Sequence, residues 1–234
     1  MSSGVVVTGG TKGIGRAIVE IFAKNGFSIF ACARSAADLD SLKSEIADKY
    51  GVSVNTSVVD VSDKRQVKEF ANLILESGVT IDVLVNNAGV FIPGSVHEED
   101  EDNLELMLDV NLKSAYWLSR AIIPSMKQRK GGYIFNICST ASIMAYPNGG
   151  SYSISKFALY GMTKNLREEL KETGIRVSAV IPGATYTASW EGIDLPEERF
   201  MKPEDLAAAV WSAYCLSPNT VMEEIILRPQ LGDI

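Results

Sequence analysis

The chain has 234 residues, with 22 basic and 29 acidic side chains and a formal net charge of −7 at pH 7. This length fits one large domain, and 46% hydrophobic with 22% charged residues is typical of a folded globular protein. The negative charge argues against a nucleic-acid binder, which usually carries a basic patch. Three widely spaced cysteines do not form a disulfide framework, and the single His97 cannot build a histidine-rich metal site. Proton chemistry therefore has to use another residue type.

Two charged clusters have ordinary structural explanations. The acidic run at residues 97–102 predicts a solvated helix start. Lys127, Arg129 and Lys130 precede two glycines, which is typical of cations at a helix C-terminus, although a site for an acidic partner is the alternative. No apolar run of about 18 residues predicts a membrane span. Because an apolar strand follows the first residues without a basic leader, we expect a cytoplasmic protein.

Short apolar runs alternate with longer amphipathic ones along the chain. We expect strands at residues 4–8, 27–33, 53–59, 83–86, 132–137, 176–181 and 224–228. Helices are expected at residues 14–25, 36–50, 63–77, 100–126, 151–172 and 203–216, the fourth being long enough to bend. This alternation predicts a single α/β domain with a Rossmann-like, doubly wound, parallel seven-stranded sheet and helices on both faces. The irregular stretch 183–202 is expected to form a lid over a substrate.

A glycine-rich segment follows the first strand and opens the first helix. It reads Thr8-Gly9-Gly10-Thr11-Lys12-Gly13-Ile14-Gly15. Glycines let the backbone turn tightly and approach a ligand, and the free N–H groups of the helix point at the same place. The segment therefore predicts a site for the pyrophosphate of a dinucleotide.

The order of the motifs resembles that of the classical branch of the short-chain dehydrogenase/reductase family. The glycine spacing is followed by Asn86-Asn87-Ala88-Gly89 after the fourth strand and by Asn111 in a helix. Ser139 stands 13 residues before Tyr152, which opens a Tyr-x-x-x-Lys motif ending at Lys156. Pro182-Gly183, with Thr185 and Thr187 behind it, follows the sixth strand. Together these motifs cover residues 8–187, which is most of the chain.

The resemblance implies a catalytic group of Asn111, Ser139, Tyr152 and Lys156. It also implies a set of residues that contact a nicotinamide cofactor: Gly9, Thr11, Lys12, Gly13, Ile14, Gly15, Arg34, Ser35, Asp60, Val61, Asn87, Ala88, Gly89, Tyr152, Lys156, Pro182, Gly183, Thr185 and Thr187. Asp60 is the residue that the resemblance places against the adenine, and a helix N-cap is its alternative role. No metal ligand is implied.

The end of the second strand indicates which nicotinamide cofactor the chain prefers. Sites for NAD(H) usually place a carboxylate there to bind the ribose 2′-hydroxyl, whereas residues 31–35 read Ala-Cys-Ala-Arg-Ser. Arg34 can bind a 2′-phosphate with its planar fork, and Lys12 can reach it from the other side. We therefore expect NADP(H), with NAD(H) less favoured.

Tyr152 and Lys156 stand four residues apart on a predicted helix, so they share one face. A nearby ammonium stabilises a phenolate, so we expect Lys156 to lower the pKa of Tyr152 from its usual value of ~10. The resemblance then implies a carbonyl reductase or alcohol dehydrogenase. Tyr152 exchanges the proton, Ser139 holds the substrate oxygen, Lys156 binds the nicotinamide ribose, and Asn111 orders water that leads to solvent.

Two other functions remain open from the sequence. One is a 3-oxoacyl-thioester reductase acting on acyl-carrier protein, although the tail at residues 224–234 lacks the Asp-Gly-Gly motif usual in that branch. The other is a non-catalytic NADP-sensing or scaffold protein on the same fold. A homodimer or homotetramer is implied by the resemblance alone.

The substrate is expected to be a small carbonyl or alcohol. Phe91, Met144, Tyr146, Tyr186 and Trp190 fall on loops at the carboxyl ends of strands, which favours an apolar or ring-bearing ketone. Cys138 has no histidine partner and is expected to pack in the core.

Overall fold

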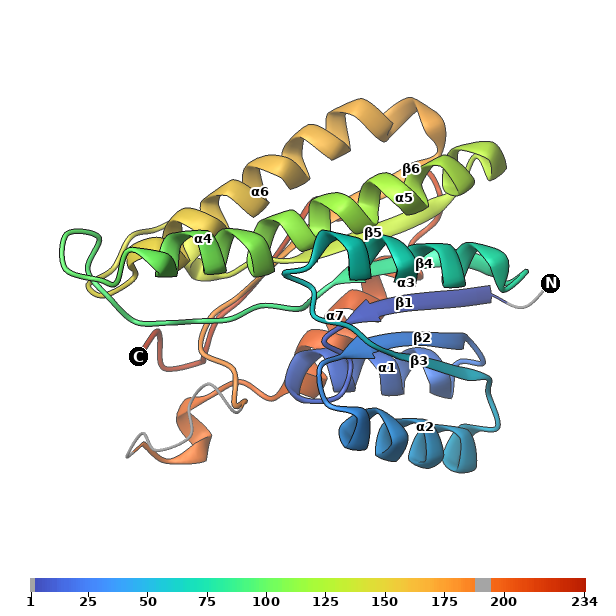
Figure 1. Ribbon diagram of the computed structural model, residues 1–234, viewed down its shortest axis with the longest axis horizontal. Coiled ribbons are helices and arrows are strands. Elements are labelled where there is room, and N and C mark those ends of the chain that lie inside the picture. Colours follow the sequence, from blue (N-terminus) through green and yellow to red (C-terminus); the bar gives the residue numbers. More distant parts are fainter. Residues whose placement is uncertain (1–2, 188–194) are drawn as a thin grey trace.

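The computed structural model describes residues 3–187 and 195–234. It is a single-domain α/β fold built on a seven-stranded parallel sheet with the strand order β3-β2-β1-β4-β5-β6-β7 (Figure 1). The strands are β1 Ser3–Thr8, β2 Ser28–Ala33, β3 Val54–Val58, β4 Thr80–Asn86, β5 Gly132–Ile137, β6 Ile175–Pro182 and β7 Glu224–Leu227. The expected sheet is confirmed, and the order reverses between β1 and β4. Such a switch point opens a crevice at the carboxyl ends of these two strands.

Helices cover both faces of the sheet (Figure 1). They are α1 Gly13–Lys24, α2 Ala36–Tyr50, α3 Lys64–Glu76, α4 Asp102–Leu108, α5 Ser114–Arg129, α6 Gly150–Leu170 and α7 Pro203–Tyr214. A π-helical turn, η1 Asp109–Lys113, joins α4 to α5, and short 3₁₀ turns lie at η2 Thr140–Ser142, η3 Lys171–Thr173 and η5 Glu197–Arg199.

The side chains of β1 show how one strand joins two cores. Val5 and Val7 pack with α1 and α7 on one face, while Val6 packs with α3 and α5 on the other. A strand with both faces covered has to be apolar along its whole length, which explains the unbroken valine run. On the first face, the ring of Phe22 lies edge-on to Phe27 at 5.1 Å, and Trp211 and Tyr214 of α7 complete that aromatic cluster.

The helix predicted at residues 100–126 is interrupted. The chain forms α4, then the π-helical turn η1, then α5. A π turn inserts one extra residue and is frequent at functional sites. Here it contains Asn111, whose buried side chain forms hydrogen bonds outside the helix.

The two charged clusters and part of the expected lid fall within the described residues. In the acidic run, α4 begins at Asp102, but Glu99 is half-buried and accepts hydrogen bonds from Ser151. Lys127 and Arg129 lie in the last turn of α5 and Lys130 is its C-cap residue, as the helix-end interpretation predicts. Arg129 also forms an ion pair with Asp82. Of the expected lid, residues 188–194, including Trp190, lie outside the described residues.

Two further properties hold for the described part of the chain. Each helix there is too short or too polar to cross a lipid bilayer. Residues 3–187 and 195–234 also contain no group of three or more His, Cys, Asp and Glu side chains that could hold a metal ion.

Candidate active site

The loop after β1 is tied to the loop after β4 at the switch point. The buried hydroxyl of Thr8 accepts hydrogen bonds from the backbone N–H groups of Asn87, at 3.0 Å, and Ala88, at 2.9 Å. The side-chain amide of Asn87 donates in return to the carbonyls of Thr8, at 2.9 Å, and Gly9, at 3.1 Å. Four hydrogen bonds therefore fix the glycine loop before any ligand binds.

Three glycines of this loop stand where a side chain would be strained or would collide. Gly9 and Gly13 have φ angles of +65° and +53°, a region that favours glycine. A Cβ on Gly15 would collide with the carbonyl oxygen of Gly9. Helix α1 thus begins directly against the loop, and its N-cap residue Lys12 makes no side-chain capping bond. The uncapped N–H groups suit a pyrophosphate. Thr11 and Ile14 are half-buried beside them.

The predicted 2′-phosphate site lies where β2 meets α2. Arg34 is exposed at the end of β2, and Ser35 is the N-cap of α2, accepting a bond from the backbone N–H of Asp38 at 3.2 Å. The ammonium of Lys12 lies 3.0 Å from the carboxylate of Asp38. The two predicted cations therefore flank one helix N-terminus, and Asp38 is a local counter-ion that the sequence analysis missed.

Asp60 and Val61 follow β3. One oxygen of Asp60 accepts hydrogen bonds from the hydroxyl and the backbone N–H of Ser62, which hold the pKa of Asp60 below its usual value, and the charge of Arg34 adds to this effect. The alternative role of Asp60 as the helix cap is wrong, because Asp63 caps α3. Val61 packs half-buried against the core.

Lys156 is buried, and only 4% of the residue is exposed. Its ammonium donates a hydrogen bond to the carbonyl of Ile137, the last residue of β5, at 2.9 Å. Burial lowers the pKa of Lys156 to about 8, since a low-dielectric environment disfavours the charged form. A Cβ on Gly89 would lie only 3.4 Å from this nitrogen and 3.2 Å from the amide oxygen of Asn111. The three predicted residues Gly89, Asn111 and Lys156 therefore meet at one point.

The ammonium of Lys156 lies 5.8 Å from the centre of the Tyr152 ring, so the expected shared face is confirmed. The expected lowering of the Tyr152 pKa is not found. Burial is the largest influence and raises the pKa of Tyr152, while hydrogen bonding to the Ser139 hydroxyl opposes this rise. The physical reason is that desolvation acts on the phenol directly, whereas the ammonium is directed at the Ile137 carbonyl.

Ser139 begins a short turn after β5. Its hydroxyl accepts a hydrogen bond from the backbone N–H of Ala141, and its own N–H donates to the hydroxyl of Ser142, each at 3.1 Å. The turn therefore holds Ser139 in an extended conformation beside Tyr152. Both sequence interpretations, turn residue and partner of the tyrosine, fit this geometry.

Asn111 links three segments of the site. Its amide oxygen accepts from the N–H of Val90 at 2.8 Å, and its amide nitrogen donates to the Val90 carbonyl at 3.0 Å and to the Ser155 hydroxyl at 2.9 Å. Ser155 in turn donates to the carbonyl of Tyr152 at 2.7 Å. Ser155 was missed by the sequence analysis, although its place inside the Tyr-x-x-x-Lys motif was a signal.

The motif after β6 lies against the glycine loop. The N–H of Gly183 donates to the carbonyl of Leu227 at 2.8 Å, and Pro182 is the last residue of β6. The Thr185 hydroxyl donates to the Gly183 carbonyl at 3.1 Å. Thr187 is so close to the loop that a Cβ on Gly13 would lie 2.9 Å from its methyl group.

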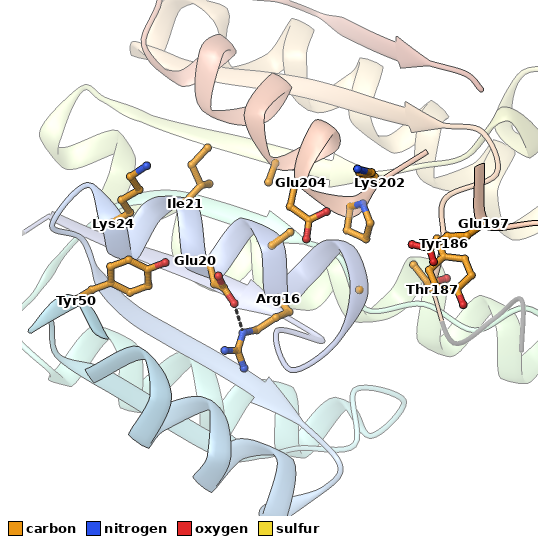
Figure 2. A pocket seen from close by; sticks show the side chains of 14 residues that line it. Arg16, Glu20, Ile21, Lys24, Tyr50, Tyr186, Thr187, Glu197, Lys202 and Glu204 are labelled. Atoms are coloured by element: carbon orange, nitrogen blue, oxygen red, sulfur yellow. Dashed lines mark hydrogen bonds and ion pairs between the residues drawn. The ribbon is translucent and has the colours of Figure 1, made fainter. Parts of the chain in front are cut away.

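A cavity of about 900 Å³ begins at Gly13 and Thr187 and runs along the outer side of α1. Figure 2 shows Lys24 and Tyr50 at one end of it and Tyr186, Thr187 and Glu197 at the other. The Arg16–Glu20 ion pair lies between these ends. Tyr152 and Ser139 do not line this cavity, so it borders the glycine loop rather than the tyrosine.

An aromatic side chain lies against Tyr152, and further large side chains are exposed on the loops that follow β5 and β6. The exposed ring of Phe91 lies edge-on to the Tyr152 ring with a centroid distance of 4.9 Å. Burial, with a smaller electrostatic contribution from Tyr152, raises the pKa of Tyr146 to about 12. Met144 and Tyr186 are exposed on the neighbouring loops. Cys138 is buried and its thiol pKa is raised to about 11 by burial, so it does not provide a reactive thiolate.

A family model described as short chain dehydrogenase matches residues 3–198. The chain belongs to the short-chain dehydrogenase family. This short-chain dehydrogenase is 36% identical, over 238 residues, to a sepiapterin reductase of Chlorobaculum tepidum, with 98% of this chain and 97% of that protein covered. It is thus an oxidoreductase.

Solved structures of the family share the whole fold of this short-chain dehydrogenase. An alcohol dehydrogenase of the archaeon Thermococcus sibiricus, complexed with 5-hydroxy-NADP, superposes with a TM-score of 0.91 at 29% identity, covering 100% of this chain and 99% of that one. An L-sorbose reductase of Gluconobacter frateurii, complexed with NADPH and L-sorbose, superposes with a TM-score of 0.87 at 28% identity, covering 97% and 96%.

The bonds of the Thr8 hydroxyl predict a measurable loss of stability. Thr8→Val keeps the shape but leaves the N–H groups of Asn87 and Ala88 without their acceptor, so we expect the free energy of unfolding in urea to fall by about 1–3 kcal/mol. Thr8→Ser retains the hydroxyl and should lose less than half as much. An unfolding free energy for Thr8→Val equal to that of the wild type would contradict this account.

Proposed function

We propose that the protein is an NADPH-dependent carbonyl reductase that also oxidises the corresponding alcohol. The observation that carries the proposal is the meeting of Ser139, Tyr152, Lys156 and Asn111 at the carboxyl edge of the sheet, beside the glycine loop. A proton donor, an oxygen-binding hydroxyl and a buried cation are the groups that carbonyl reduction requires.

Three observations support NADP(H) as the cofactor. The backbone around Gly13 and Gly15 leaves no space for side chains, which suits close approach of a pyrophosphate. Arg34 and Lys12 flank the N-terminus of α2, where a 2′-phosphate would sit. The Thermococcus and Gluconobacter structures are complexes with 5-hydroxy-NADP and NADPH. When bound, the cofactor supplies the hydride.

The chain's own residues then move the proton and orient the substrate. The Tyr152 hydroxyl donates its proton to the carbonyl oxygen during reduction and takes it back during oxidation. The Ser139 hydroxyl holds that oxygen in line with Tyr152. Lys156 binds the nicotinamide ribose, and its charge stabilises the phenolate left on Tyr152. Asn111 orders the water that returns a proton to the site, and Ser155 fixes its amide.

The apolar surroundings of Tyr152 support a ring-bearing or apolar ketone as substrate. Phe91 lies edge-on to the phenol ring, and Met144, Tyr146 and Tyr186 are exposed on the loops that follow β5 and β6. Exposed aromatic faces bind planar rings by stacking. The Chlorobaculum relative is named a sepiapterin reductase, so sepiapterin is a first candidate to test.

The 3-oxoacyl-thioester alternative receives less support. Lys127, Arg129 and Lys130 end α5 just before β5 begins, which places them at the amino edge of the sheet, opposite the tyrosine. Arg129 is also held by Asp82 and by the carbonyl of Ile81. A scaffold role receives less support too, because the four predicted catalytic residues stand together.

We include a homodimer or homotetramer and a cytoplasmic location in the proposal. Ile154 and Phe157 are exposed on α6, and such apolar side chains favour contact with a second copy. The three cysteines are free, which fits a reducing compartment.

A carbonyl panel followed by NADPH absorbance tests the mechanism. Tyr152→Phe removes the proton donor, so we expect turnover of every accepted ketone to fall at least about 100-fold, with the NADPH dissociation constant unchanged. Tyr160→Phe, on the same helix but bonded to Glu224, is the matched control and should keep its rate. Retained turnover in Tyr152→Phe would refute the proposed role.

Cofactor preference tests the basic pair. Arg34→Ala should raise KM for NADPH about tenfold, because a charge-assisted bond to the 2′-phosphate is lost, and should leave KM for NADH unchanged. Lys43→Ala, at an exposed lysine further along α2, serves as the control. Equal wild-type rates with NADH and NADPH would count against the assignment.

The lowered pKa of Lys156 predicts that activity begins to fall at a mildly alkaline pH. An amine with a pKa of about 8 loses its charge well below the ordinary lysine range, while the raised pKa of Tyr152 keeps the phenol protonated there. We therefore expect kcat/KM for NADPH in the reduction direction to be constant below about pH 8 and to fall above it. In Lys156→Arg the charge persists, so the residual activity should no longer fall above about pH 8. A fall that begins only above pH 10 would contradict the prediction.

A further inference from the structure

Helix α6 carries both Tyr152 and Lys156, yet it begins without a cap of its own. Its N-cap residue is Gly149, which has no side chain to accept a hydrogen bond, and its first turn contains no acidic residue. The first N–H groups of a helix lack partners inside the helix, and a Ser, Thr, Asp or Asn N-cap usually satisfies one of them. The start of α6 therefore needs an acceptor from elsewhere.

Glu99 supplies that acceptor from 52 residues upstream. The backbone N–H of Ser151 donates to both carboxylate oxygens of Glu99, at 3.1 and 3.3 Å, and the Ser151 hydroxyl donates to one of them. Ser151 is buried and Glu99 half-buried, so water competes little for these bonds. A carboxylate at a helix N-terminus is also favoured by the helix dipole.

The surrounding backbone is shaped around this contact. The N–H of Gly94 donates to the Asn148 carbonyl at 3.1 Å, and the Ser95 hydroxyl bonds the Asn148 amide oxygen at 3.3 Å. Gly150 has a φ of +38°, and a Cβ there would lie 2.8 Å from Glu99 Oε2 and would collide with the carbonyl of Gly94. The loop after β4 and the loop before α6 are thus closed against each other.

The contact between the two loops affects the reacting groups through Ser151 on one loop and Phe91 on the other. Ser151 directly precedes Tyr152, so fixing its N–H fixes the turn that directs the phenol. Phe91, which lies edge-on to the Tyr152 ring at 4.9 Å, belongs to the same loop as Glu99. A shift of about 1 Å in a reacting group, caused from a distance, can cost about 100-fold in rate.

We propose that Glu99 is a positioning residue that caps α6 from another loop and so sets the placement of Tyr152 relative to Ser139 and to the substrate wall at Phe91. The proposal rests on the proposed function, because it takes Tyr152 to be the proton donor. Glu99 belongs to the acidic run at residues 97–102, and the proposal assigns it Ser151 as its partner. The neighbouring Glu98, with a side chain 74% exposed beside His97, has no contact of this kind among its described interactions.

The test compares Glu99→Ala, Glu99→Gln and Ser151→Ala with the matched control Glu98→Ala, using a ketone that the wild type reduces with NADPH. We expect kcat to fall about tenfold in Glu99→Ala, while the NADPH dissociation constant stays within twofold, because the glycine loop is not part of this contact. Glu99→Gln keeps one accepting oxygen and should recover part of the rate. Glu98→Ala should match the wild type, and backbone amide exchange at residues 150–152 should accelerate in Glu99→Ala, less in Glu99→Gln, and not in Glu98→Ala.

Three results would overturn the proposal: equal kcat in Glu99→Ala and Glu98→Ala, a parallel loss of NADPH binding and kcat, or unchanged amide exchange at residues 150–152. If Glu99→Ala does not fold, Glu99→Gln decides, because it removes one of the two accepting carboxylate oxygens, and wild-type kcat with wild-type amide exchange in that variant overturns the proposal. Failure of the proposed function is recognised separately, by absent carbonyl turnover in the wild type or by full turnover in Tyr152→Phe. The amide-exchange result does not depend on either.

Discussion

Lys156 places an amine in the interior at the carboxyl edge of the sheet, and the neighbouring segments are arranged around it. Burying a charge is costly unless it is hydrogen-bonded, and the carbonyl of Ile137 provides that bond at 2.9 Å. Compensation is incomplete, because the pKa falls from 10.5 to about 8, which means that the ammonium is less stable here than in water by about 3 kcal/mol. A bound ligand that offers further acceptors would raise this pKa again and keep the amine charged to higher pH, so the amine is prepared for ribose hydroxyls or a phenolate.

The π-helical turn follows from the same arrangement. Gly89 brings its backbone against both Lys156 and Asn111 because it has no Cβ, and Asn111 then holds the next residue, Val90, through two backbone hydrogen bonds. A side chain that bonds a neighbouring loop so closely constrains the helix that bears it. The π-helical turn Asp109–Lys113 contains one extra residue, and it lies at the point where Asn111 makes these bonds. The interruption is thus part of the site rather than a defect in the helix.

Sequence patterns predicted the elements whose stability is local and missed the contacts made between loops. The helix at 36–50 and the strand at 132–137 have the predicted bounds, because Ser35 and Gly51 mark the helix ends and the strand is buried at every residue after its first. The π turn has no signal in the periodicity, since it depends on Asn111 reaching Val90. The roles of Glu99 and Asp38 depend on partners brought near by the fold, and an acidic run looks solvated until Ser151 is placed beside it. The expected pKa of Tyr152 was wrong for a related reason: spacing along a helix gives the distance to Lys156 but not the depth of burial.

The rise in the Tyr152 pKa changes how the catalytic pair has to be understood. Burial disfavours the phenolate of Tyr152 and the ammonium of Lys156 separately, yet a proton transfer to substrate leaves the tyrosine anionic. The ammonium lies 5.8 Å from the centre of the Tyr152 ring. In a low-dielectric site a neighbouring anion and cation attract each other far more strongly than in water, so each charge becomes favourable once the other is present. The tyrosine therefore stays neutral and protonated until a proton acceptor arrives, and the lysine is stabilised as a cation in the same step. Burial, which opposes each charge alone, makes the pair cooperative, and this cooperation needs the fixed placement of α6.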